Sequence, residues 1–235
     1  MNQGMLSLLL AIAASAIGPA DVLPAEGTEQ EPKWLETVWT AEVGEDIYES
    51  PEVQGGRVYA ANSCGAVTSL DLTSGKVLAR TTFDLGSNHR LPIQVAATPD
   101  GLFLARGHLV RRCDLTNLET VWSADLGESH QCLAVAGGRL LTTTYPDVIL
   151  LDAESGKVIW RKKVGSQGRG VLLGGNFALY ASNTEECRFL DLVTGETRWT
   201  ARAEEYCHAL ALGPGVVYYG SGAYRLKDGS ALWTV

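Results

Sequence analysis

Five polar side chains recur at one equivalent point of a repeating pattern in this sequence, four residues after the end of each predicted outer strand. They are Tyr48, Arg90, Gln131, Arg169 and His208. Guanidinium, imidazole, amide and phenol groups that converge on one opening can bind an anionic or polar ligand, or a peptide segment, through charge-assisted hydrogen bonds. We therefore predict a ligand-binding mouth at these residues, with simple solvation of loop side chains as the alternative.

The common catalytic patterns are absent from the sequence. It contains no G-x-S-x-G nucleophile elbow, no H-E-x-x-H zinc motif, no P-loop and no calcium-binding loop. We therefore predict no catalytic residue, no metal site and no cofactor. The cysteines make no C-x-x-C pair, and their odd number leaves at least one thiol free or paired with another chain, whereas the others are either bridged or buried as small apolar residues. They are Cys64, Cys113, Cys132, Cys187 and Cys207.

An internal repeat supplies the elements that would position the polar side chains. In "LDAESGKVIW", residues 151–160, an aspartate lies eight residues before a tryptophan and a glycine lies four before it. The same spacing, with Ala79, Leu118 and Arg225 as departures, recurs along the chain, and the tryptophan positions are 34 to 43 residues apart. A fixed period near 40 residues indicates stacked supersecondary units. The residues of this structural motif are Trp39, Asp71, Gly75, Asp114, Trp122, Asp152, Gly156, Trp160, Asp191, Gly195, Trp199, Gly229 and Trp233.

Each period contains four short apolar runs separated by turns, for example "QCLAVA", "RLLTTTY", "VILLDA" and "VIWRKKV". Four antiparallel strands per period make a propeller blade, in which a turn glycine supplies the positive φ. The predicted fold class is all-β, a β-propeller of about five four-stranded blades plus an extra N-terminal outer strand. That strand and the last one compete for one sheet edge, so we consider an incompletely closed ring and a homodimer formed through unpaired outer strands.

The pattern A-x-D-x-x-[T/S]-G-x-x-x-W is the tryptophan-docking motif of pyrroloquinoline quinone (PQQ) type β-propellers. The copies at 71–79, 152–160 and 191–199 resemble it from the aspartate onward, and the resemblance covers about residues 34–235. It brings to mind PQQ dehydrogenases, which use about eight blades, a bound calcium and often a vicinal disulfide. This chain has five periods and no adjacent cysteines, which argues against such an enzyme, and PQQ with calcium is kept only as an alternative.

Three segments divide the chain. Residues 1–20 carry no charged side chain and hold an apolar run, which is typical of a secretory signal peptide. A polar linker spans 21–33 and the PQQ-like propeller domain spans 34–235. We expect a periplasmic or secreted protein without a membrane span after processing. The net charge of −8, without a cluster of Lys and Arg, argues against a nucleic-acid partner.

Our leading functional hypothesis is a non-catalytic binding or scaffolding propeller of the cell envelope, which presents a polar central mouth to a protein partner or a small anionic or polar ligand. It looks like the periplasmic propellers that help assemble outer-membrane proteins. A quinone-linked or other propeller enzyme is the first alternative. A sugar-binding, lectin-like propeller is the second.

Overall fold

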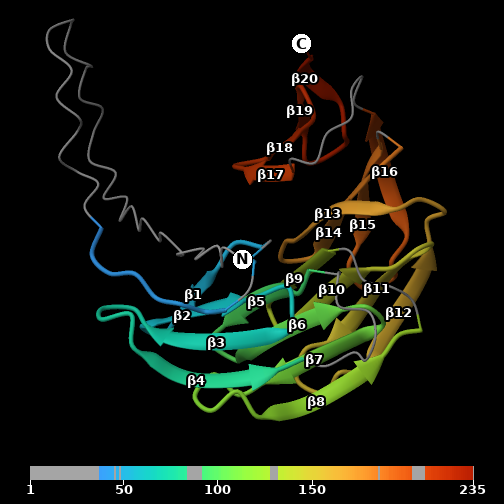
Figure 1. Cartoon of the computed structure of the whole chain (residues 1–235). Coiled ribbons are helices and arrows are strands. Elements are labelled where there is room, and N and C mark those ends of the chain that lie inside the picture. Colours follow the sequence, from blue (N-terminus) through green and yellow to red (C-terminus); the bar gives the residue numbers. More distant parts are fainter. Residues whose placement is uncertain are drawn as a thin grey trace, which may run out of the picture.

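The structure is a computed structural model, and it describes residues 37–44, 46–47, 49–83, 92–127, 132–184, 186–202 and 210–234. Within these ranges the chain forms twenty β-strands and no helix. The strands make five four-stranded antiparallel sheets, each from consecutive strands. The sheets lie side by side in a curved array (Figure 1). The predicted all-β propeller with five blades is therefore confirmed.

Blades 1 to 5 follow the order of the chain. Blade 1 contains β1 (Glu52–Gln54), β2 (Arg57–Ala61), β3 (Ala66–Asp71) and β4 (Val77–Thr82). Blade 2 contains β5 (Gln94–Thr98), β6 (Gly101–Arg106), β7 (Leu109–Cys113) and β8 (Thr120–Asp125). Blade 3 contains β9 (Cys132–Ala136), β10 (Arg139–Thr143), β11 (Asp147–Asp152) and β12 (Val158–Lys163). Blade 4 contains β13 (Gly168–Leu173), β14 (Phe177–Ser182), β15 (Glu186–Asp191) and β16 (Thr197–Arg202). Blade 5 contains β17 (Leu210–Gly213), β18 (Val216–Tyr219), β19 (Gly222–Arg225) and β20 (Ala231–Thr234).

The hydrophobic core lies between the blades. All six residues of β6 and all six of β14 are buried, because neighbouring blades cover both faces of these middle strands. Four hydrophobic clusters occupy the four contacts between consecutive blades. The first strands of consecutive blades also pack against one another, which places β1, β5, β9, β13 and β17 on the inner side of the array.

The turn between the third and fourth strands of a blade is built by local hydrogen bonds. In blade 1, the Asp71 carboxylate accepts the backbone N–H groups of Thr73 and Ser74 at 3.1 and 2.8 Å. The Gly75 N–H donates to the Asp71 carbonyl at 2.9 Å, and Gly75 has a φ of +70°. Glycine adopts this left-handed conformation at the lowest steric cost. Aspartate and glycine therefore fix the turn together.

Four of the motif tryptophans lie over the turn of the following blade, an arrangement that we call docking. The indole N–H donates to the backbone carbonyl of the residue that follows the aspartate position, at 2.9 to 3.1 Å. The ring covers the turn glycine, so closely that a Cβ atom added at Gly156 would lie 2.7 Å from the ring of Trp122. The glycine thus makes room for the ring as well as for the turn. The four pairs are Trp39 with Leu72, Trp122 with Ala153, Trp160 with Leu192 and Trp199 with Leu226.

A bulge interrupts the outer strand of every blade. The pairing of β12 with β11 shifts between Trp160 and Val158, which leaves Ile159 without a partner residue, and the other four outer strands shift at the equivalent place. Bulges on an edge strand bend it and hinder pairing with the edge of another sheet.

The ring does not close. Among the described residues no hydrophobic cluster joins blade 5 to blade 1. The face of blade 1 that points away from blade 2 is instead covered by the N-terminal segment, with Trp39 and Val43 packed on Val58 and Leu70. This segment has one bridged residue, Ala41, where the sequence predicts an outer strand. It therefore occupies the place of the outer strand of a preceding blade.

Candidate functional site

Of the five residues of the predicted mouth, the structure describes one, Arg169. Tyr48, Arg90, Gln131 and His208 lie outside the described residues, and their role stays a prediction. Arg169 is exposed near the start of β13, the inner strand of blade 4. Its guanidinium Nη2 donates to the side-chain oxygen of Gln167 at 3.3 Å. The site can therefore be built outward from blade 4.

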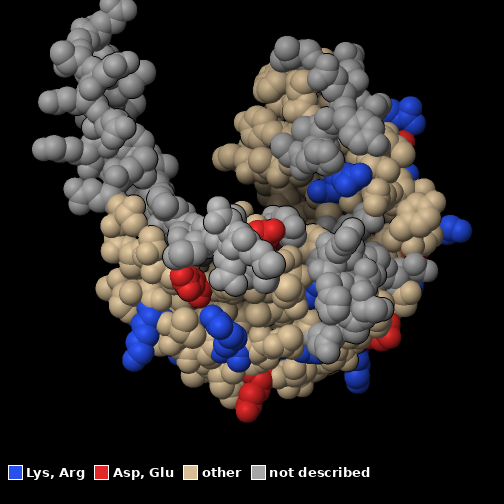
Figure 2. Space-filling view, viewed as in Figure 1, with Lys and Arg blue, Asp and Glu red and all other residues tan. Residues whose placement is uncertain are grey.

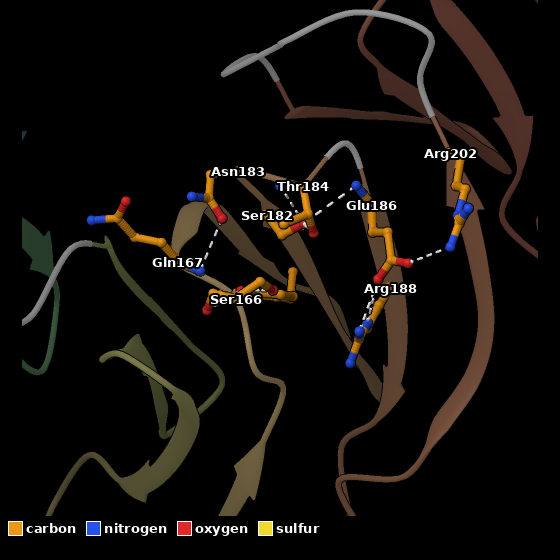
Figure 3. A network of polar contacts seen from close by, with 9 residues as sticks. Ser166, Gln167, Ser182, Asn183, Thr184, Glu186, Arg188 and Arg202 are labelled. Atoms are coloured by element: carbon orange, nitrogen blue, oxygen red, sulfur yellow. Dashed lines mark hydrogen bonds and ion pairs between the residues drawn. The ribbon is translucent and has the colours of Figure 1, made fainter.

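Two reciprocal hydrogen bonds fix the approach to β13. The Gln167 N–H donates to the Asn183 side-chain oxygen at 3.0 Å, and the Asn183 N–H donates to the Gln167 carbonyl at 2.9 Å. Below them the hydroxyl groups of Ser166 and Tyr180 are 2.9 Å apart in the interior. Residues 166–169, 182–184 and 186 are thus joined by polar contacts, many of which Figure 3 shows, and together with Arg188 and Arg202 we call them the blade-4 rim.

Ser182 organises the turn between β14 and β15. Its hydroxyl oxygen accepts the N–H groups of Thr184 and Glu186, both at 3.2 Å, and lies 2.9 Å from the Thr184 hydroxyl. These contacts show that Ser182 supports the turn.

Glu186 is the electrostatic centre of the rim. Arg188 donates to one of its carboxylate oxygens at 2.8 and 3.2 Å, and Arg202 donates to the other at 3.0 Å. These hydrogen bonds, Arg188 first, hold the pKa of the Glu186 carboxyl below its usual value. The Glu186 side chain is mostly buried, whereas the Arg202 side chain is 78% exposed. Arg202 therefore presents unused donors to solvent.

The described charges of the rim do not cancel. Arg169, Arg188 and Arg202 contribute three positive charges against one negative charge from Glu186. On the face that Figure 2 shows, the described basic and acidic side chains are interspersed without a large patch of one sign. The described side chains of the blade-4 rim therefore carry an excess of positive charge, and their exposed guanidinium groups are suited to hydrogen bonds with a carboxylate.

Sequence reasoning missed Asn183, Glu186 and Arg188 because it followed only the start of the inner strand. The signal in the sequence was the polar run "SNTEECR", residues 182–188, which spans the end of β14 and the start of β15. Arg202 could not be added without knowing the pairing of β15 with β16, in which Glu186 lies opposite Arg202.

The four cysteines that the structure describes are free thiols. Cys64 is exposed, whereas burial raises the pKa of the Cys132 thiol to about 11 and that of the Cys187 thiol to about 12. Such thiols are poor nucleophiles at neutral pH. Within the described ranges, no group of three or more His, Cys, Asp or Glu side chains could hold a metal ion. No helix in that part of the chain is long and apolar enough to cross a membrane.

A known protein family matches this chain over much of its length. The family model described as outer membrane protein assembly factor BamB matches residues 106–235, which is more than half of the chain. The chain belongs to the BamB family. This match confirms the predicted resemblance to PQQ-type repeat propellers.

One curated relative is outer membrane protein assembly factor BamB of Alkalilimnicola ehrlichii. It is 37% identical over 84 residues, which are 34% of this chain and 22% of the relative. The match thus spans about a fifth of the length of that BamB.

Solved structures share the fold. The computationally designed Ika8 protein superposes with a TM-score of 0.69 at 12% identity, over 79% of this chain and 60% of that chain. BamB from Moraxella catarrhalis gives 0.66 at 15% identity, over 86% and 68%. The Pan2 WD40 domain of Neurospora crassa gives 0.63 at 13% identity, over 77% and 63%. At these identities the likeness concerns the fold alone, and this chain spans about two thirds of each structure.

Proposed function

We propose that this protein is a non-catalytic binding or scaffolding propeller of the cell envelope that contributes to outer membrane protein assembly through a protein partner. Membership of the BamB family carries this proposal. The name of the Alkalilimnicola ehrlichii relative supports it over the matched part of the chain. We place the protein in the periplasm, on the basis of the predicted signal peptide.

We propose the blade-4 rim as the surface that contacts this partner. The two exposed guanidinium groups, of Arg169 and Arg202, lie at the two ends of a hydrogen-bonded surface whose loops are held by side-chain contacts. Charge-assisted hydrogen bonds from arginine suit a carboxylate, so an acidic peptide segment is the partner chemistry that fits best. The same surface would accept a small anionic ligand.

Site-specific crosslinking in cells tests this assignment. A photoreactive amino acid placed at Gln167 or Arg202 should form adducts with a protein of the outer membrane assembly machinery. Val193, which is 81% exposed in the opposite turn of blade 4, is the matched control. Adducts of equal yield from Val193, or none from the rim, would contradict the assignment.

A functional variant complements the crosslinking. Arg169→Ala combined with Arg202→Ala should lower the amount of assembled outer membrane protein in cells. The stability of the purified chain should fall by about 1 kcal/mol at most, because both side chains are exposed and Glu186 keeps its hydrogen bonds from Arg188. A large loss of stability with unchanged assembly would give these arginines a structural role.

We further propose that the protein works without a bound cofactor. Incubation with PQQ and calcium, followed by absorbance and dye-reduction measurements, distinguishes this from the quinone-enzyme alternative. Quinone-dependent dye reduction would overturn the non-catalytic assignment.

A further inference from the structure

A pocket lies between blades 2 and 3, at the opposite end of the strands from the turns of the blade-4 rim. Its volume of about 340 Å³ is near the lower limit of ligand pockets, which are typically about 300–1,000 Å³. The turn between β5 and β6, a side chain of β7 and two turns of blade 3 form its walls. The lining residues are Asp100, Arg112, Gly138, Ala153 and Glu154. The size therefore suits a small molecule.

Three of the lining residues depart from the repeat. Every other blade has a leucine at the position of Ala153, partly buried against a hydrophobic cluster. These leucines are Leu72, Leu115, Leu192 and Leu226. At the position of Arg112 the other blades have Ser69, Leu150, Phe189 and Ala223. At the position of Asp100, blades 1, 3 and 5 have Gly56, Gly138 and Gly215. A smaller side chain and added charges thus coincide at this one blade boundary.

Backbone carbonyl groups on both sides of the boundary hold Arg112 in place. Its Nε and Nη2 atoms donate to the carbonyl of Asp100, and its Nη1 atom donates to the carbonyl of Glu154 at 3.2 Å. These contacts leave two of the five guanidinium N–H groups, one on each Nη atom, without a partner among the described residues. A guanidinium that is already fixed loses little further conformational freedom when it receives a carboxylate.

The pocket also carries charge of the opposite sign. Asp100 and Glu154 are exposed, and neither they nor Arg112 form an ion pair with any described residue. The adjacent Arg139 is different, because it pairs with Asp152 at 3.3 Å. Opposite charges that line one pocket without meeting each other can each bind one end of a ligand that bears both charges.

We propose that this pocket binds a small zwitterion of the α-amino acid class. The ligand carboxylate accepts hydrogen bonds from the two remaining N–H groups of Arg112, and the ligand ammonium group lies between the carboxylates of Asp100 and Glu154. Ala153 leaves space for the atoms that join the two charged groups. A simple anion would be repelled by the two carboxylates, and a simple cation by the guanidinium. The site is separate from the blade-4 rim and does not rest on the proposed function.

The alternative role of Arg112 is to join the two blades. Arg57 provides the matched comparison, because its Nη1 atom donates to the carbonyl of Thr116 at 3.2 Å, in the equivalent turn of blade 2. Leu115 keeps the usual leucine there. Arg57→Gln therefore removes an arginine between two blades without changing the pocket.

Free glycine is the probe, because it carries both charged groups and no side chain. Titration into the ¹⁵N-labelled full chain should give saturable amide shifts at Gly138, Ala153 and Glu154. The dissociation constant should be on the order of 1 mM, because both ion pairs stay partly exposed. Acetate and methylammonium, which carry one charge each, should bind about tenfold more weakly, because each lacks one set of hydrogen bonds between charged groups.

Two variants connect the shifts to the pocket. Ala153→Leu introduces the leucine of the other blades and should abolish the glycine-dependent shifts. Arg112→Gln should weaken glycine binding by about tenfold, since it removes a charged donor, whereas Arg57→Gln should leave the binding unchanged. Urea unfolding of each variant confirms that the titrated chain is folded.

Several results would overturn the proposal. They are the absence of saturable shifts with glycine, equal affinity for acetate or methylammonium, and glycine binding that persists unchanged in folded Ala153→Leu or Arg112→Gln. An equal loss of binding in Arg57→Gln would also do so. Arg112 would then serve only to join blades 2 and 3.

Discussion

Replacing Gly156 with alanine separates two reasons why this position holds glycine, namely its left-handed backbone and the space that the Trp122 ring occupies. Gly156 lies in the turn between β11 and β12 with a φ of +71°, and an added Cβ would lie 2.7 Å from atoms Cδ2 and Cε3 of Trp122. Gly138, in the turn between β9 and β10 of the same blade, has the same φ of +71° but open space around its Cβ position. The pair therefore forms a matched comparison of backbone strain with and without the indole.

The expected free energies of unfolding follow from these contacts. A left-handed conformation costs a residue with a Cβ about 1–2 kcal/mol, and both variants carry this cost. Gly156→Ala should also displace Trp122, which donates to Ala153 at 3.1 Å and packs 6.2 Å from Phe103 between ring centroids. Losing a hydrogen bond and an aromatic contact adds about 1–3 kcal/mol. Gly156→Ala should thus destabilise the protein more than Gly138→Ala by that amount.

Urea unfolding followed by circular dichroism measures both variants, alone and combined with Trp122→Ala. Without the indole, Gly156→Ala should cost no more than Gly138→Ala, because only the backbone strain remains. Equal costs in the presence of Trp122, or a difference that persists in its absence, would refute the docking explanation.

Three further outcomes are expected. Because hydrogen bonds lower the folded-state pKa values of Asp71 and Asp191, the latter to about 2, their stabilisation should be complete above pH 4 and should be lost as the pH falls from 4 towards 2; urea midpoints over this range should drop less steeply for Asp191→Asn. Of the four described cysteines, Cys64 alone should react rapidly with a maleimide at pH 7, and mass spectrometry of a Cys64→Ser variant identifies the labelled site. Trp39→Ala should destabilise the protein by about 2 kcal/mol in urea unfolding, since it removes a half-buried indole and its hydrogen bond to Leu72; an unchanged midpoint would mean that the N-terminal segment does not stabilise blade 1.

The blades could be predicted from the sequence because their signals are local. Asp71 and Gly75 are bonded within one five-residue turn, and its Asp-x-x-[S/T]-Gly pattern recurs in blades 3 and 4. The position of Trp39 relative to the next turn follows from the repeat as well. Strand count, blade count and the extra N-terminal element therefore needed no knowledge of distant contacts.

The blade-4 rim depends on register, which the sequence does not state. Glu186 and Arg202 meet because β15 and β16 pair antiparallel with a bulge near Phe189. Moving this pairing by one residue would place the two side chains on opposite faces of the sheet. The contacts between blades are not stated by the sequence either, because side chains from two neighbouring blades fill the space between them.

The contact between blades 1 and 2 shows how this filling is adjusted. Ala79 stands in the tryptophan position of blade 1, and Leu118 stands in the glycine position of the next turn, buried with a φ of +62°. Both belong to the same hydrophobic cluster. The left-handed conformation costs Leu118 about 1–2 kcal/mol, whereas burial of a leucine side chain contributes about 1.5–3 kcal/mol. Leucine can occupy this strained position because the indole is absent, and the indole can be absent because leucine fills its space.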